Sequence, residues 1–153
     1  MAIHITTAQP TDPEVSAMLR EHAREMGEVS PPESVHTLEP DELSSGGARI
    51  WAAWRDGEVV GVVALVPVAD RHAELTSMRT VAAARRQGVG AALLARLLEE
   101  AAEAGFSRVS LETGADEFFE PARRLYERRG FEVTGPFGSY REDANSVFMT
   151  IEI

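Results

Sequence analysis

A basic turn that contains two glycines carries the strongest chemical signal in the chain. Arg85 and Arg86 precede Gly88 and Gly90 at the point where an extended segment gives way to a helical pattern. Such a turn directs backbone N–H groups and the positive end of a helix dipole toward one position. Glycine allows close approach there, because a Cβ would collide with a bound group. The pattern therefore predicts an anion site, and a phosphate is the anion that best suits it.

Two kinds of phosphate site begin with a strand, a glycine turn and a helix. The dinucleotide fingerprint needs a third glycine, but Leu93 occupies that position, although Glu112 lies at a suitable distance for the acidic residue. The chain after the turn is also too short for a doubly wound sheet. The second kind is defined by the signature R/Q-x-x-G-x-G/A, and residues 85–90 read R-R-Q-G-V-G.

A second motif lies downstream, where residues 122–131 read A-R-R-L-Y-E-R-R-G-F. Together the two runs resemble the R/Q-x-x-G-x-G/A and A-x-x-L-Y-x-x-x-G-F motifs of the GCN5-related N-acetyltransferases (the GNAT family). Residues 49–134 follow the element order of that family closely, and the flanks match in element order only. The chain is therefore identified as a member of this family by resemblance.

The resemblance implies an α+β fold of three-layer type. Its central sheet is expected to be mixed, mostly antiparallel and six- to seven-stranded, with about four helices and one β-α-β cofactor unit. The implied co-substrate is acetyl-CoA, with no metal. Its pyrophosphate is expected on the amides of residues 86–91, and its pantetheine arm along the backbone of residues 78–80. The residues expected to bind it are Met78, Arg79, Thr80, Arg85, Arg86, Gln87, Gly88, Val89, Gly90, Ala91, Thr113 and Phe119. Many relatives carry asparagine where this chain has Phe119, so one contact to the pantetheine is missing or differs.

The resemblance also assigns the chemistry to two residues. Tyr126 matches the family tyrosine that protonates the departing CoA thiolate, a role open to a phenol held beside the sulfur. Glu74 is the expected base for the amine, with Glu112 or a water relay as alternatives. Two-residue periodicity puts Glu74, Thr76 and Met78 on one face of a strand, unless a bulge intervenes. The two motifs imply direct attack in a ternary complex, and the chain has no cysteine that could act as a nucleophile.

The acceptor is predicted to be a primary amine on a small molecule, such as an amino acid or another amine. Acetylation of a protein N-terminus or lysine, or acyl-CoA binding without catalysis, remain alternatives. The candidate acceptor-binding residues are Ser34, His36, Glu112, Tyr140, Arg141 and Asn145. If Arg141 faces the site, the acceptor could carry a carboxylate.

The elements that must position these residues follow from periodicity and turn residues. A helix from Pro13 to about Gly27 has Asp12 as its predicted N-cap, and His22 lies within its stripe of apolar residues. An irregular segment, 28–47, is predicted to be a functional loop or lid. The remaining helices are predicted at about 89–104 and 121–129, and the strands at 2–6, 49–54, 59–68, 73–81, 107–113, 131–133 and 146–153. The whole chain, 1–153, is predicted to form a single N-acetyltransferase domain.

The composition limits the partners. The formal net charge of −10 argues against nucleic-acid binding and suits cationic acceptors. No apolar run is long enough for a membrane span, and the N-terminus lacks signal-peptide features, so a cytoplasmic protein is expected. The sequence leaves open whether the protein is a monomer or a homodimer.

Overall fold

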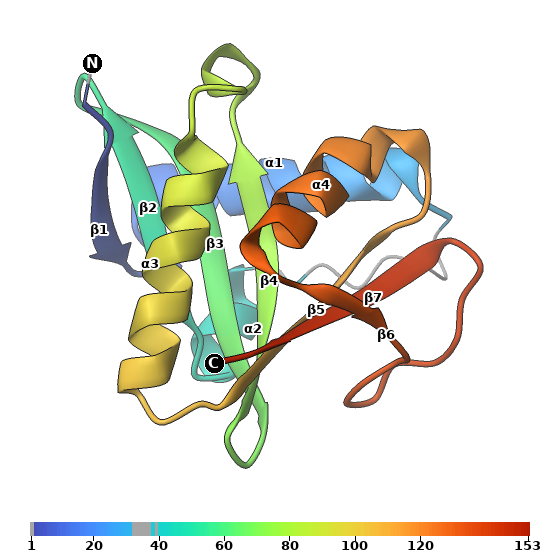
Figure 1. Cartoon of the computed structure of the whole chain (residues 1–153). Helices are drawn as coiled ribbons and strands as arrows, with labels where there is room; N and C mark the ends of the chain where they lie inside the picture. The colour runs from blue at the N-terminus through green and yellow to red at the C-terminus, as the bar shows by residue number, and fades with distance from the viewer. Residues whose placement is uncertain (1, 32–37, 39) are drawn as a thin grey trace.

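The computed structural model describes residues 2–31, 38 and 40–153, and a mixed sheet of seven strands runs through this part of the chain (Figure 1). The strand order across the sheet is β1-β2-β3-β4-β5-β7-β6, and only β4 and β5 pair in parallel. The strands are β1 (His4–Ala8), β2 (Arg49–Arg55), β3 (Glu58–Ala69), β4 (His72–Thr80), β5 (Arg108–Gly114), β6 (Glu132–Thr134) and β7 (Ser146–Glu152).

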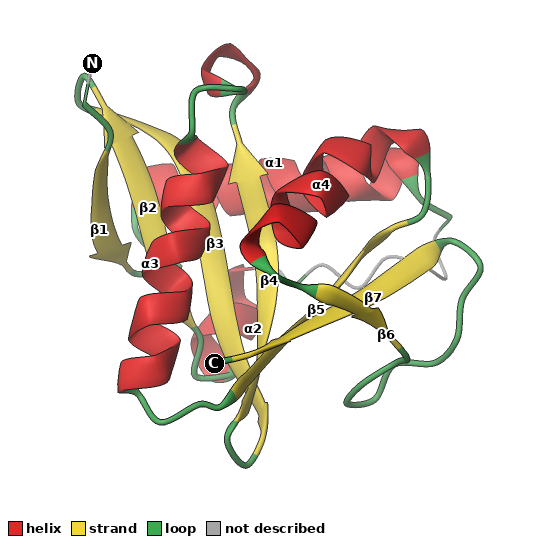
Figure 2. Ribbon diagram, viewed as in Figure 1, coloured by secondary structure: helices red, strands yellow, loops and turns green. Residues whose placement is uncertain are grey.

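Helices cover both faces of this sheet (Figure 2). The α-helices are α1 (Pro13–Val29), α2 (Pro40–Ser45), α3 (Val89–Glu103) and α4 (Glu120–Arg129), and the short 3-10 helices are η2 (Ala82–Ala84) and η3 (Glu117–Phe119). α1 and α2 pack on one face over Ile50, Val62 and Ala64. α3 and α4 pack on the other face, where Leu93, Leu97 and Tyr126 join Trp51 and Val63. Two cores therefore sandwich one sheet, as expected for a three-layer α+β fold.

The predicted fold class is confirmed, and so is the β2–β3 hairpin. Asp56 and Gly57 have φ values of 54° and 80°, and a two-residue turn of this kind requires positive φ at both positions. The connection between β4 and β5 runs through α3 and supplies the predicted β-α-β unit. None of the helices in the described ranges is long and apolar enough to cross a membrane.

Two boundaries near the N-terminus differ from the prediction. β1 runs from His4 to Ala8 rather than over residues 2–6, and α1 continues to Val29. Asp12 is the N-cap residue, but its carboxylate accepts from the backbone N–H of Gln9 (3.0 Å) instead of capping the helix.

The segment 28–47 is not uniformly irregular, because α2 occupies its C-terminal part. Pro40 begins this helix, Asp41 and Glu42 lie in its first turn, and Leu43 is fully buried. The burial of Leu43 against α1 and β3 stabilises a helix that is too short to be detected from periodicity. The prediction of a loop is therefore wrong for residues 40–45.

Candidate active site

A large cavity opens where the sheet splits between β4 and β5. The two strands pair only at three successive positions, from His72 with Arg108 to Glu74 with Ser110, while β5 stays paired with β7 along its whole length. Beyond Glu74 the strands diverge, as Figure 1 shows. The resulting cavity has a volume of about 1060 Å³ and is lined by α1, β4, the end of β5, the start of α3, and α4.

A bulge in β4 decides which side chains face each side of this cavity. Val62 pairs with Arg79, but Ala64 pairs with Thr76, so β4 contains one extra residue, and Ser77 there has a φ of 56°. Glu74, Thr76 and Arg79 consequently lie on the α1 face, and Arg79 donates to Glu25 of α1 at 2.8 Å.

Met78 packs against the other core, beneath α3 and α4. Met78 does not share a face with Glu74 and Thr76, because the bulge that the sequence analysis left open as an exception is present and reverses the alternation. The backbone of β4 beyond Glu74 is not paired with β5, so its edge is exposed to the cavity.

The glycine turn forms one end of the cavity. Gly88 caps α3 with a φ of 83°, and a Cβ at this position would meet nothing within 4 Å. The first intrahelical bond runs from the N–H of Ala92 to the carbonyl of Gly88 (3.0 Å), so the amides before Ala92 have no carbonyl acceptor within the helix. Arg86 has a φ of 64°, a strained conformation for a residue with a side chain.

Most residues predicted to bind the cofactor border this cavity. Those that line it are Met78, Arg79, Thr80, Arg85, Arg86, Gly88, Val89, Gly90, Ala91, Thr113 and Phe119. Gln87 does not line it, because its side chain bonds to the carbonyl of Ala83 and to the guanidinium of Arg55. Arg128 and Arg129 of α4 also line the cavity, which the sequence analysis did not predict.

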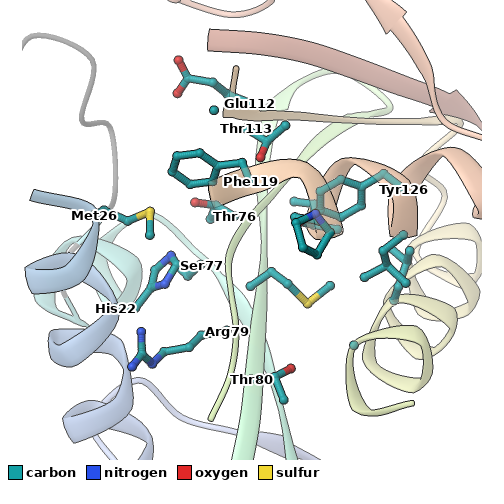
Figure 3. Close-up of a pocket in the computed structure, with 18 of the residues that line it drawn as sticks. His22, Met26, Thr76, Ser77, Arg79, Thr80, Glu112, Thr113, Phe119 and Tyr126 are labelled. Atoms are coloured by element: carbon teal, nitrogen blue, oxygen red, sulfur yellow. The ribbon is translucent and has the colours of Figure 1, made fainter. Parts of the chain in front are cut away.

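Tyr126 lies on α4 with its side chain turned into the cavity wall (Figure 3). It is 5% exposed and packs against Phe131, with ring centroids 5.7 Å apart. Burial raises the pKa of Tyr126 well above its ordinary value of 10. The phenol therefore keeps its proton throughout the neutral and mildly alkaline range.

Phe119 forms part of the wall near the end of β5. Its ring packs so closely on Gly114 that a Cβ there would lie 2.0 Å from Phe119 Cδ2. Arg123 holds this corner, because it donates to the carbonyl oxygens of Gly114 (2.6 Å) and Asp116 (3.0 Å). Phe119 stands where many relatives have asparagine, and Gly114, which has no side chain, leaves the space that the Phe119 ring occupies.

Two carboxylates lie at the far end of the cavity from the glycine turn. Glu74 accepts a hydrogen bond from the hydroxyl of Tyr140 (2.6 Å), and Glu112 accepts one from the hydroxyl of Ser146 (2.8 Å). Burial, and then the charge and hydrogen bond of Glu74, raise the pKa of Tyr140, and Glu112 raises it further. Glu74 and Glu112 both line the cavity, as does Tyr140.

The loop between β6 and β7 positions Tyr140. Its ring packs against Phe137 and Phe148, with centroid distances of 5.1 and 5.8 Å, and Phe137 also contacts His72 (5.8 Å). This aromatic cluster fixes the loop on the α1 face of the sheet, beside Glu74.

Only some of the predicted acceptor-binding residues line the cavity. Glu112, Tyr140 and Asn145 line the cavity. Arg141 is exposed and does not line it, so the suggestion that it faces the site is wrong. The turn that ends at Tyr140, closed by its N–H bond to the carbonyl of Phe137 (3.1 Å), and the packing of its ring on Phe137 and Phe148 direct Tyr140 rather than Arg141 toward the sheet. Ser34 and His36 lie outside the described residues.

His22 of α1 and Ser77 of β4 also line the cavity wall and were not predicted from the sequence. His22 Nδ1 and Ser77 Oγ are buried and have no hydrogen-bond partner in the described part of the chain. The available signal was a histidine within an apolar helical stripe. Over the described ranges, no cluster of three or more metal-ligating side chains is found.

Comparison with known proteins identifies the family. The model of the acetyltransferase (GNAT) family matches residues 15–131. The chain is 44% identical over 148 residues to the uncharacterized N-acetyltransferase YsnE of Bacillus subtilis (strain 168), covering 97% of this chain and 98% of that protein. It is 34% identical over 148 residues to the IAA acetyltransferase of Azospirillum brasilense, covering 96% and 95% of the two chains.

Solved structures agree in fold. A Klebsiella pneumoniae protein described as a candidate acyl-CoA N-acyltransferase superposes with a TM-score of 0.78 at 27% identity, covering 98% of this chain and 97% of the other. The PaiA N-acetyltransferase of Thermoplasma acidophilum, solved with coenzyme A, gives a TM-score of 0.75 at 18% identity over the full length of both chains. The chain belongs to the GNAT family of acetyl-CoA-dependent acyltransferases.

Proposed function

We propose that this enzyme transfers the acetyl group of acetyl-CoA to the primary amine of a small molecule, by direct attack in a ternary complex. One observation carries the proposal. A single cavity joins the glycine turn, the open edge of β4, Tyr126 and the Glu74–Tyr140 pair. The parts needed for donor binding, proton transfer and acceptor binding are thereby arranged along one path.

The glycine turn suits the pyrophosphate of the donor. The amides of the first turn of α3 point toward the cavity end, and the helix dipole adds positive potential there. Arg85 and Arg86 line this end and supply charge-assisted contacts. The empty space beside the Gly88 Cα is where a phosphate oxygen could approach the backbone.

The unpaired edge of β4 suits the pantetheine arm. Its amide groups need partners, and beyond Glu74 neither β5 nor any other strand of the described ranges supplies them on this side. An extended amide-containing chain can bind such an edge as an added strand does. Backbone groups of residues 78–80 take this role, while the Arg79 side chain points away, toward Glu25.

Tyr126 acts as the general acid in this proposal. When the amine nitrogen bonds to the acetyl carbon, the C–S bond breaks and the sulfur leaves as a thiolate, to which the phenol donates its proton. The phenol of Tyr126 is protonated at neutral pH, which is the form that an acid requires.

Glu74 acts as the base that takes the proton lost by the attacking amine. Its hydrogen bond from Tyr140 fixes the carboxylate in the cavity wall, and the carboxylate of Glu112, which lines the same cavity, attracts the ammonium form of the acceptor. Opposite charges at the two ends of the cavity favour an anionic donor at the arginines and a cationic acceptor at the carboxylates.

Enclosure of the acceptor end supports a small molecule. Met26 of α1 and Ser30, which follows α1, bound it on one side, and Tyr140 and Asn145 of the β6–β7 loop bound it on another. A volume of about 1060 Å³ suits the pantetheine arm together with a compact amine.

The test is a thiol-release assay with acetyl-CoA and a panel of small amines, beside peptides with free N-termini or lysines. Wild-type enzyme should acetylate a small amine, and Tyr126→Phe should lower kcat by roughly two to four orders of magnitude without changing CoA affinity. Glu127→Gln, an exposed neighbour on α4 outside the cavity, is the matched control. Arg85→Ala should weaken CoA binding roughly tenfold in calorimetry.

Each part of the proposal can fail separately. Turnover by Tyr126→Phe that equals the wild type across pH excludes the general-acid role. Turnover with peptides alone assigns a protein acceptor, and CoA binding without thiol release for any amine identifies a binding module.

A further inference from the structure

Two unpaired polar atoms lie in the wall between α1 and β4. His22 Nδ1 and Ser77 Oγ are buried and have no hydrogen-bond partner among the described residues. A buried polar group left in this way destabilises the fold, so such groups are rare without a reason. Two of them in one cavity wall point to a group that arrives from outside the chain.

The local structure turns both side chains toward the same region. His22 lies on the α1 stripe that faces the sheet, and Ser77 is the bulge residue of β4 with a φ of 56°. Both residues line the cavity, and Figure 3 shows them on the side of β4 that faces α1. Ser77 thus has a strained backbone conformation at a position where its hydroxyl makes no hydrogen bond to the described residues.

This part of the wall carries no net charge. Burial, and then the nearby Arg79, lower the pKa of His22 to about 4, although Glu25 acts in the opposite sense, so the imidazole is neutral at pH 7. The guanidinium of Arg79 is compensated by Glu25 at 2.8 Å, and both side chains are largely buried. A carboxylate on the acceptor would have to compete with Glu25 for this arginine, whereas an uncharged group would not.

We propose that His22 and Ser77 form a subsite for an uncharged hydrogen-bonding group of the acceptor, a hydroxyl or an amide. The favoured acceptor class is then a primary amine with such a group, its ammonium lying toward Glu74 and Glu112. This inference rests on the proposed acetyl transfer to amines. A neutral imidazole offers one donor and one acceptor nitrogen, and rotation about χ2 presents either nitrogen to the cavity. Ser77 supplies the complementary hydroxyl.

The subsite also predicts what the enzyme disfavours. An alkylamine of the same length would leave both buried polar atoms unpaired, and sites built to bind a polar group discriminate strongly against analogues without it. An amino acid would place a carboxylate beside a neutral imidazole and an arginine that is already paired.

The experiment compares matched amines with purified wild-type enzyme, His22→Phe and Ser77→Ala. The probes are hydroxyalkylamines and aminoalkyl amides of several chain lengths, each beside the alkylamine of equal length. Wild-type kcat/KM should favour the polar member of the best pair by at least roughly tenfold, and this ratio should fall close to one in both variants. Arg20→Gln, an exposed residue of α1 outside the cavity, should keep the wild-type ratio.

Calorimetric CoA binding reports whether each variant is folded, and Ser77→Ala is a small change if His22→Phe fails to fold. A wild-type ratio near one at every chain length overturns the subsite but leaves acetyl transfer to amines intact. Retention of the preference in both folded variants overturns it as well. Absence of thiol release with every amine, while acetyl-CoA binds, overturns the proposed function and this inference together.

Discussion

Acidification should destabilise this protein through His22. In the folded chain, burial and Arg79 lower the pKa of this imidazole from 6.5 to about 4. As the pH falls below 6.5, the unfolded chain gains a proton at His22, and the folded chain does not until about pH 4. The unfolded state therefore binds more protons in this window, and the free energy of unfolding decreases as the pH falls.

The size of this effect follows from the two pKa values. One pKa unit corresponds to about 1.4 kcal/mol, so the full interval between 6.5 and about 4 amounts to about 3 kcal/mol. At pH 7 almost none of this is lost, and at pH 5 roughly 2 kcal/mol has been lost. These are upper figures, because the ring keeps partial contact with the cavity and its solvent.

Urea unfolding at pH 7 and pH 5 measures the effect when wild type is compared with His22→Phe. The two proteins share every carboxylate, so the difference between their pH dependences isolates His22, whatever offset the new ring introduces. Wild type should lose roughly 1–2 kcal/mol more than His22→Phe between these pH values. Equal losses, or an NMR titration that gives His22 a pKa near 6.5, would refute the argument for a desolvated neutral imidazole.

Three further substitutions test the cavity walls. Gly114→Ala should displace the Phe119 ring and weaken CoA binding, because the new Cβ would lie 2.0 Å from Phe119 Cδ2. Adding Phe119→Ala should restore the space and the CoA affinity. Failure of this rescue in calorimetry would contradict the packing argument. Tyr140→Phe keeps the aromatic packing but removes a hydrogen bond to a carboxylate, so kcat/KM for the amine should fall by roughly tenfold or more while CoA affinity stays constant. An unaltered kcat/KM would show that this bond does not support the base. Gly88→Ala should destabilise the fold by only about 1–2 kcal/mol, since a φ of 83° strains alanine but its Cβ meets no atom. CoA affinity should fall further than this strain explains, and wild-type affinity would place the phosphates elsewhere.

Features encoded by neighbouring residues could be predicted from the sequence. The β2–β3 turn depends on Asp56 and Gly57 alone, and the helix that follows Gly88 depends on a local stripe of leucines. The resemblance to the family motifs then allowed the order of the helices and strands to be predicted. The face of the sheet on which a side chain lies could not be predicted in the same way. One inserted residue at Ser77 moves each later side chain of β4 to the opposite face.

Contacts between distant segments could not be predicted. The hydrogen bond between Tyr140 and Glu74 joins residues 66 positions apart, and the aromatic packing of the β6–β7 loop selects Tyr140 rather than Arg141. His22 illustrates a further limit. A histidine in an apolar stripe is compatible with a satisfied core residue. Only the structure shows that its Nδ1 has no partner within residues 2–31, 38 and 40–153 while its ring faces a cavity.

The bulge at Ser77 links the two halves of the proposed site. Because of the extra residue, Arg79 faces α1, where Glu25 neutralises it, and Met78 packs beneath α3 and α4. In a regular strand, Arg79 would instead lie on the side of Tyr126, where a cation would lower the pKa of the phenol and oppose the effect of burial. The same displacement leaves Ser77 in the wall beside α1, where its hydroxyl has no partner in the part of the chain that the structure describes. One irregularity in β4 therefore keeps the positive charge of Arg79 away from the proposed acid and creates the uncharged wall that we assign to the acceptor.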